Sequence, residues 1–233
     1  MLTADLTPIL VYAACAWLPT AVAAVALRDW YPALPTWWRL GYEGLIAVLY
    51  IAAPIALVGF SRVGLRWPGL VPMILYPAAG FISALVILLA LDRILPSPTG
   101  QRLPLMQRPQ LRAFAAHQFV LATVSSEIMF RGYLLLEMGR GLGAWPAFGI
   151  QLGLFALDHL PRDLYALPRR QVWSAAFLHT LLQHLIIGGT LGLVALGTQS
   201  ILPSIALHIY LMVVIFIVFS VSTLRALTGA PQT

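Results

Sequence analysis

Long apolar runs, separated by short polar connections, organise this chain of 233 residues. A helix needs about 20 mostly apolar residues to cross a bilayer, because each residue adds about 1.5 Å and the hydrocarbon core is about 30 Å thick. The runs that qualify extend approximately over Leu6–Leu27, Leu40–Phe60, Leu70–Leu91, Ala113–Leu136, Trp145–Leu160, Ser174–Leu196 and Ile201–Leu224. The pattern therefore predicts an all-α fold, a polytopic transmembrane helix bundle of about seven spans.

The longest polar connection divides these runs into two groups. It extends from Asp92 to Arg112 and is rich in Pro, Arg and Gln. We therefore expect an N-terminal part, residues 1–112, made of three transmembrane helices and this connection. A C-terminal membrane core, residues 113–233, would hold the other four helices and all of the candidate chemistry.

The composition agrees with a membrane protein and excludes an ordinary soluble domain. Hydrophobic residues make up 60% of the chain and charged residues only 9%, whereas a soluble domain carries about 25% charged residues. The single cysteine, Cys15, lies in an apolar run, so no disulfide framework is expected. The first residues, Met-Leu-Thr-Ala-Asp, lack the basic region that begins a cleavable signal peptide.

The distribution of positive charge predicts how the chain is oriented in the membrane. It does not indicate nucleic-acid binding. The net charge is +6 and every basic residue is an arginine, placed in the short connections between apolar runs. With seven spans, one side of the membrane receives Arg28, Arg39, Arg93, Arg102, Arg108, Arg112, Arg162, Arg169, Arg170 and Arg225, and the other receives Arg62, Arg66 and Arg140. Because positive loops stay inside, we expect a cytoplasmic C-terminus, in a bacterial inner (cytoplasmic) membrane.

The fourth run contains two charged residues at membrane depth, Glu127 and Arg131. An ionised side chain there costs roughly 2.5–3.5 kcal/mol, so it persists where it is paired or serves a function. Residues four apart share a helix face, so these two can neutralise each other. The pair is either a functional site or a buried ion pair that fixes the register of the helix.

Two histidines lie at comparable depth in other runs, His159 near the end of the fifth and His208 in the seventh. With Glu127 they would bring a carboxylate and two imidazoles together near the middle of the bilayer. Such a group suits general acid–base chemistry, and the same atoms suit a metal ion. Each histidine is equally compatible with a hydrogen-bonded packing role. The sequence leaves open whether a metal ion or a cofactor is bound.

The order and spacing of these residues form three motifs. The first reads Ser126-Glu127-Ile-Met-Phe-Arg131, the second Phe155-x-x-x-His159, and the third His208-x-x-x-Met212. From Ser125 to Met212 the chain resembles the CAAX protease and bacteriocin-processing family (CPBP, or Abi), which includes the type II prenyl-protein endopeptidases. The resemblance implies a CAAX-protease-like core in the C-terminal half. It also implies that Glu127, Arg131, His159 and His208 are catalytic, and that Ser126, Phe155 and Met212 line the binding site.

The first and third motifs depart from those of the family. The family has Glu-Glu-x-x-x-Arg, so Ser126 replaces the glutamate that, with the second-motif histidine, is thought to activate water. It has His-x-x-x-Asn, so Met212 replaces an amide that is thought to stabilise the oxyanion. A serine is no general base by itself, and a methionine donates no hydrogen bond. Losing one oxyanion donor typically costs about 10²–10³ in rate.

Three hypotheses of function follow. The resemblance implies an intramembrane endopeptidase acting on membrane-associated peptides or proteins, with an impaired active site. A second hypothesis is a catalytically inactive homologue that binds or assembles a membrane-protein complex. In a third, the membrane histidines hold a tetrapyrrole within a pigment or haem complex. The expected partners are the lipid bilayer and a membrane-protein or lipidated-peptide substrate or partner. The sequence does not identify the oligomeric state.

Overall fold

The computed structural model describes residues 7–19, 21–22, 36–95, 121–166 and 174–214. The elements in these ranges are helical: α1 (Thr7–Tyr12), η1 (Ala13–Trp17), α3 (Thr36–Val58), α4 (Leu70–Ile94), α6 (Thr123–Ser126), η4 (Glu127–Glu137), α7 (Met138–Leu142), α8 (Ala144–Ala166), α9 (Ala175–Thr198) and an apolar helix, Leu202–Val214. The all-α fold class is therefore confirmed for the described residues.

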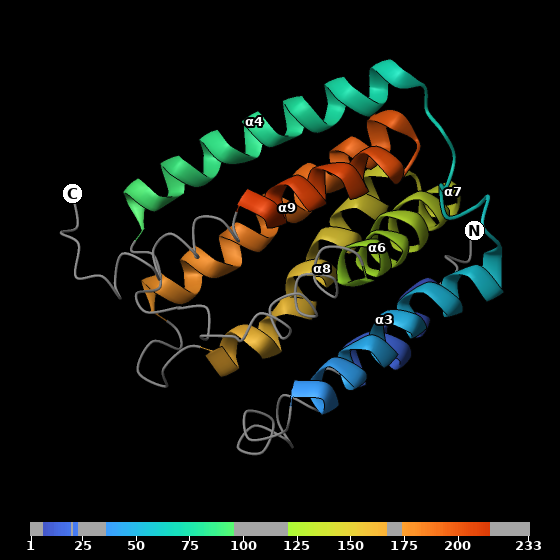
Figure 1. The fold of residues 1–233 in the computed structure, drawn as a ribbon, viewed down its shortest axis with the longest axis horizontal. Helices are drawn as coiled ribbons and strands as arrows, with labels where there is room; N and C mark the ends of the chain where they lie inside the picture. The colour runs from blue at the N-terminus through green and yellow to red at the C-terminus, as the bar shows by residue number, and fades with distance from the viewer. Residues whose placement is uncertain (1–6, 20, 23–35, 96–120, 167–173, 215–233) are drawn as a thin grey trace.

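The long helices lie side by side (Figure 1). Helix α4 lies along one edge of the bundle and packs on α9, which packs on α8. Helix α8 packs in turn on η4, and α3 contacts η4 from the opposite edge. This order places η4, which begins with the predicted Glu127, in the interior of the bundle.

Three of the described helices are long and apolar enough to cross a membrane: Gly41–Val58 within α3, the whole of α4, and the whole of α9. The expectation of seven spans is not confirmed. The described part of the fourth run contains α6 and most of η4, and the described part of the last run contains Leu202–Val214, a shorter apolar helix. Most of the arginines that predict the orientation lie outside the described residues, so the orientation stays a prediction.

The element η4 is a π-helix of 11 residues, and all of them but the last, Glu137, are buried. Every residue from Glu127 to Leu136 is buried. Contacts with α8, α9, α3 and α1 account for this, because they cover η4 from several directions. In a π-helix each N–H bonds to the carbonyl five residues earlier, and such segments frequently occur at functional sites.

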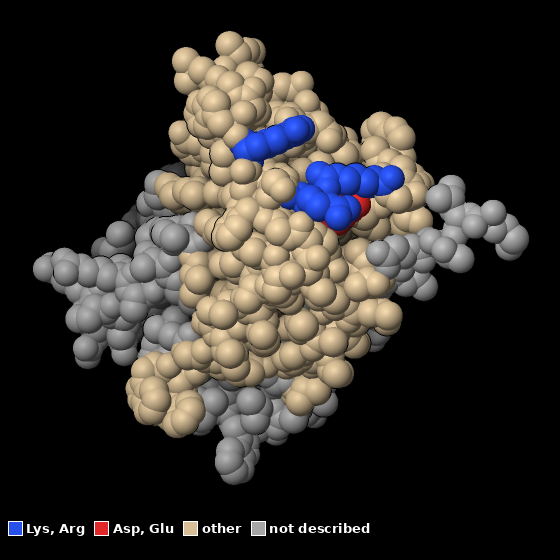
Figure 2. Space-filling model, turned by 90° about the vertical axis from the view of Figure 1, so that its right-hand side faces the viewer, with Lys and Arg blue, Asp and Glu red and all other residues tan. Residues whose placement is uncertain are grey.

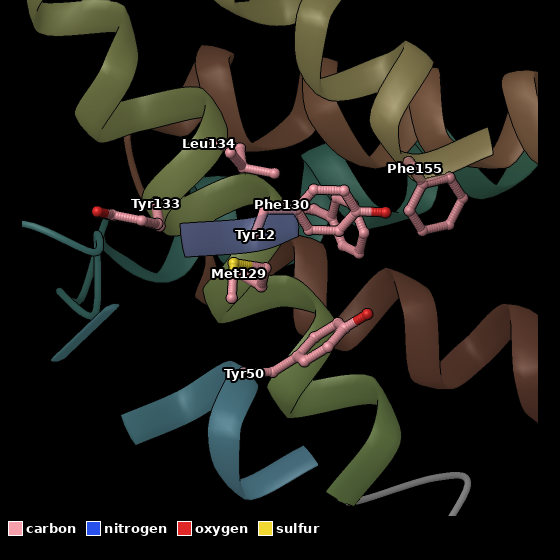
Figure 3. Packing of buried hydrophobic residues seen from close by; sticks show 7 residues of the cluster. All are labelled: Tyr12, Tyr50, Met129, Phe130, Tyr133, Leu134 and Phe155. Carbon is pink, nitrogen blue, oxygen red and sulfur yellow. The ribbon is translucent and has the colours of Figure 1, made fainter. Parts of the chain in front are cut away.

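A cluster of aromatic and apolar side chains joins the N-terminal elements to η4 and α8 (Figure 3). Its buried members are Tyr12, Tyr50, Met129, Phe130, Tyr133, Leu134 and Phe155. The ring of Phe130 meets that of Phe155 edge-on at 5.2 Å between centroids, and that of Tyr12 at 5.4 Å. The N-terminal helices therefore share a core with the C-terminal membrane core. The division at residue 112 stays a prediction.

Helices α8 and α9 approach each other closely at Gly188. A Cβ atom built on Gly188 would lie 2.6 Å from Cδ1 of Phe155, a distance that real Cβ atoms do not adopt. The Phe155 ring thus occupies the space that any larger residue would need. The absence of a side chain at Gly188 fixes both the helix spacing and the position of this ring.

We predict that Gly188→Ala destabilises the protein by about 1–3 kcal/mol, because overpacking displaces the Phe155 ring or separates the two helices. The matched control is Gly153→Ala on α8, where a Cβ would meet no atom within 4 Å. In that open position alanine should be neutral or stabilising, since it is the better helix former. Thermal unfolding in detergent measures both changes, and equal melting temperatures would contradict the close-packing explanation.

Candidate active site

Both carboxylate oxygens of Glu127 are engaged in the centre of the bundle. Oε2 accepts a short hydrogen bond from the Ser204 hydroxyl, and Oε1 lies 2.8 Å from Nδ1 of His208. A carboxylate only accepts hydrogen bonds, so Nδ1 of His208 is the donor. Nη1 of Arg131 lies 3.3 Å from Oε1. The structure thus brings Glu127, Arg131 and His208 together, and their roles in catalysis stay a prediction.

Arg131 connects this carboxylate to two further helices. Its Nη2 donates to the carbonyl oxygen of Gly188 on α9 at 3.2 Å. Its Cζ lies 4.4 Å from the centre of the Phe155 ring on α8, which is within the range of a cation–π contact. Neither the Glu127 nor the Arg131 side chain has any exposed surface. Arg131 is therefore a buried cation that binds η4 to its neighbours.

His159 lies beyond the Phe155 ring, and no contact between it and the Glu127 carboxylate is found among the described residues. Its Nδ1 is 2.8 Å from the carbonyl oxygen of Phe155. Its ring lies 4.5 Å from the Phe155 ring and 4.2 Å from that of His184 on α9. Arg131 and His159 therefore both contact Phe155, which links the first motif to the second.

The two residues that depart from the family motifs lie on the same elements as the cluster. Ser126 is half-buried at the end of α6, and its hydroxyl donates to the carbonyl oxygen of Thr123 at 3.1 Å. This bond turns its hydroxyl back to its own helix. Met212 is half-buried on the Leu202–Val214 helix, one turn after His208. At these two positions the chain supplies neither a carboxylate nor an amide.

Two polar residues near the cluster were not singled out from the sequence. Ser204 lies four residues before His208, and this spacing on a helix is the signal that identifies it. Asp158 lies beside His159 and accepts a hydrogen bond from the Tyr50 hydroxyl at 2.6 Å. Tyr50 belongs to α3 and lies more than 100 residues earlier in the chain. No local pattern in the sequence therefore predicts the hydrogen bond between Tyr50 and Asp158.

The described residues contain no group of three or more His, Cys, Asp and Glu side chains arranged to hold a metal ion. The structure therefore adds no metal site to the acid–base chemistry considered for this cluster.

Residues 108–214, which contain all three motifs, match the family model described as type II CAAX prenyl endopeptidase Rce1-like. This segment is Rce1-like. The resemblance to the CPBP family is thereby confirmed for this segment, and the three candidate spans indicate an integral membrane protein. No curated protein and no solved structure is significantly similar to the chain.

We predict that Arg131→Leu destabilises the Rce1-like segment strongly. Removing one partner of a buried ion pair typically costs about 3–5 kcal/mol, because the remaining charge is left uncompensated. The double variant Glu127→Gln, Arg131→Leu should recover part of this loss, since it leaves no buried anion. Thermal stability in detergent provides the measurement. If Arg131→Leu has the same melting temperature as the wild type, the buried charge of Glu127 does not require Arg131 for its compensation.

Proposed function

We propose that this protein binds prenylated or other membrane-associated peptides in the manner of an Rce1-like endopeptidase, and that it hydrolyses them weakly or not at all. The observation that carries the proposal is the enclosure of Glu127. Its side chain has no exposed surface, and its carboxylate is already engaged with Ser204, Arg131 and His208. The proposed role of Glu127 is to hold the site together.

Peptide hydrolysis requires a water molecule in contact with a general base. The Glu127 side chain is fully buried, an arrangement that does not favour an attacking water molecule beside its carboxylate. Activation would instead require a carboxylate at position 126, which the family supplies and this chain does not. Ser126 cannot replace it, because a hydroxyl does not take up a proton at neutral pH.

The features that remain are suited to binding. His208 is slightly exposed, at 13% of its side chain, and His159 is half-buried, so both imidazoles reach the margin of the packed core. The segment that carries both histidines matches a family model named for prenyl endopeptidase activity. We propose a membrane-associated peptide or protein as the ligand. The proposed setting is a bacterial inner membrane, with the C-terminus in the cytoplasm.

We predict that Ser126→Glu combined with Met212→Asn raises hydrolysis of a farnesylated CAAX peptide at least about tenfold above wild type, since one oxyanion donor alone is worth about 10²–10³ in rate. The wild type should bind this peptide and cleave it near background. Peptide cleavage is followed by mass spectrometry, and binding by fluorescence of a labelled peptide.

The matched control is Ser126→Gln with Met212→Asn, which has nearly the same size but no general base, and it should show no gain. Melting temperatures verify that both double variants are folded. Robust cleavage by the wild-type protein that Glu127→Ala abolishes would contradict the proposal, because Glu127 would then be the working base. Failure of the wild type to bind the peptide would contradict the binding part of it.

A further inference from the structure

A second polar site lies where the α3–α4 connection meets the end of α9. The backbone N–H of Ile201 donates to the carbonyl oxygen of Gly64 at 3.0 Å, and the Ser200 hydroxyl donates to that of Arg66 at 2.6 Å. Gly64 adopts a φ of 77° and is buried, a conformation that favours glycine. These hydrogen bonds join the α3–α4 connection to the residues that directly follow α9.

A cavity of about 250 Å³ lies at this junction. A single water molecule needs only about 10–15 Å³ of such space, so the cavity admits a group as large as a phosphate diester. Its lining residues are Ser61, Gly64, Arg66, Leu136, Arg140 and Gln199. The lining is mostly polar and includes two guanidinium groups.

The charges around the cavity favour an anion. Arg62, Arg66 and Arg140 contribute three positive charges, and Glu137 contributes one negative charge. Arg62 donates from Nε to Glu137 at 3.0 Å, and Nη1 of Arg140 lies 2.5 Å from the same carboxylate. Figure 2 shows the basic side chains gathered in one region of this face, over an acidic residue.

Arg66 is the arginine of this group that bonds no carboxylate among the described residues. Its Nε donates to the carbonyl oxygen of Gln199 at 2.7 Å. That bond orients the guanidinium group and leaves both Nη atoms available for a ligand. Two parallel N–H groups of an arginine match the geometry of a phosphate.

The position of the cavity along the helices places it at the level of lipid headgroups. Arg66 lies in the connection between two candidate spans, the first of which ends at Val58 and the second of which begins at Leu70. The third candidate span ends at Thr198, directly before Gln199. Trp67 in the same connection is 64% exposed, as expected of an aromatic residue at the membrane interface.

We propose that this cavity binds the phosphate group of an anionic phospholipid, with Arg66 and Arg140 as the donors. A lipid fits better than a free phosphate ion, because the cavity opens where three candidate spans end and the acyl chains can lie against their exposed apolar faces. The lipid connects α3, α4, α7 and α9 at one membrane surface. This binding is independent of peptide binding near Glu127.

The test measures stabilisation of the purified full-length protein in neutral detergent by three additions. These are dioleoyl phosphatidylglycerol, dioleoyl phosphatidylcholine, and inorganic phosphate. Phosphatidylglycerol should raise the melting temperature most. In Arg66→Gln the lipid concentration for half of this effect should rise at least about tenfold, since a hydrogen bond between charged groups is worth about 1.5–3 kcal/mol.

The matched control is Arg93→Gln, which removes an exposed arginine from the last turn of α4, away from the cavity. It should respond to phosphatidylglycerol as the wild type does. Arg66→Gln leaves the Arg140–Glu137 pair intact, so its melting temperature without lipid should stay near that of the wild type. An unchanged lipid response in Arg66→Gln, an equal loss in Arg93→Gln, or an equal effect of inorganic phosphate alone would overturn the proposal.

Discussion

The carboxylate of Glu127 is the constraint on which the rest of the described structure depends. A charge in a membrane interior must be compensated by its surroundings, and here the compensating groups come from two elements. Arg131 comes from the same π-helix, and His208 and Ser204 come from the Leu202–Val214 helix. Arg131 also contacts two further helices. It donates a hydrogen bond to the Gly188 carbonyl oxygen on α9 and makes a cation–π contact with Phe155 on α8. One buried anion is thus linked, directly or through Arg131, to η4, α8, α9 and the Leu202–Val214 helix.

This arrangement gives the Rce1-like motifs a structural meaning that does not require hydrolysis. In this chain Glu127 pairs with Arg131 and with His208, although position 126 is a serine. The Phe155 ring contacts both the Arg131 guanidinium and the His159 ring.

Much of the site was predictable from the sequence, because helical spacing is local. The four-residue separation of Glu127 and Arg131 predicts their contact, and the apolar runs predict helices at nearly the right places. The contact between Glu127 and His208 was expected from their similar depth. These inferences hold because they depend on periodicity and on the cost of burying charge.

The remaining features depend on how distant segments pack. Nothing in the local sequence indicates that residues 127–137 form a π-helix, which is stabilised by contacts on several sides. The Tyr50–Asp158 hydrogen bond and the close approach at Gly188 also join segments far apart in the chain. The number of spans was harder to predict, since a helix enclosed by other helices tolerates polar residues that lower its hydropathy.

The most direct test compares two neighbouring residues, one inside the polar cluster and one bonded to its own helix. Thermal unfolding in detergent of Glu127→Ala and Ser126→Ala measures what each side chain contributes to stability. If Glu127 anchors the bundle, Glu127→Ala loses about 3–5 kcal/mol, because Arg131 is left without its counter-charge, and Ser126→Ala changes stability little. If Glu127→Ala is as stable as the wild type or more so, Glu127 is not the structural anchor.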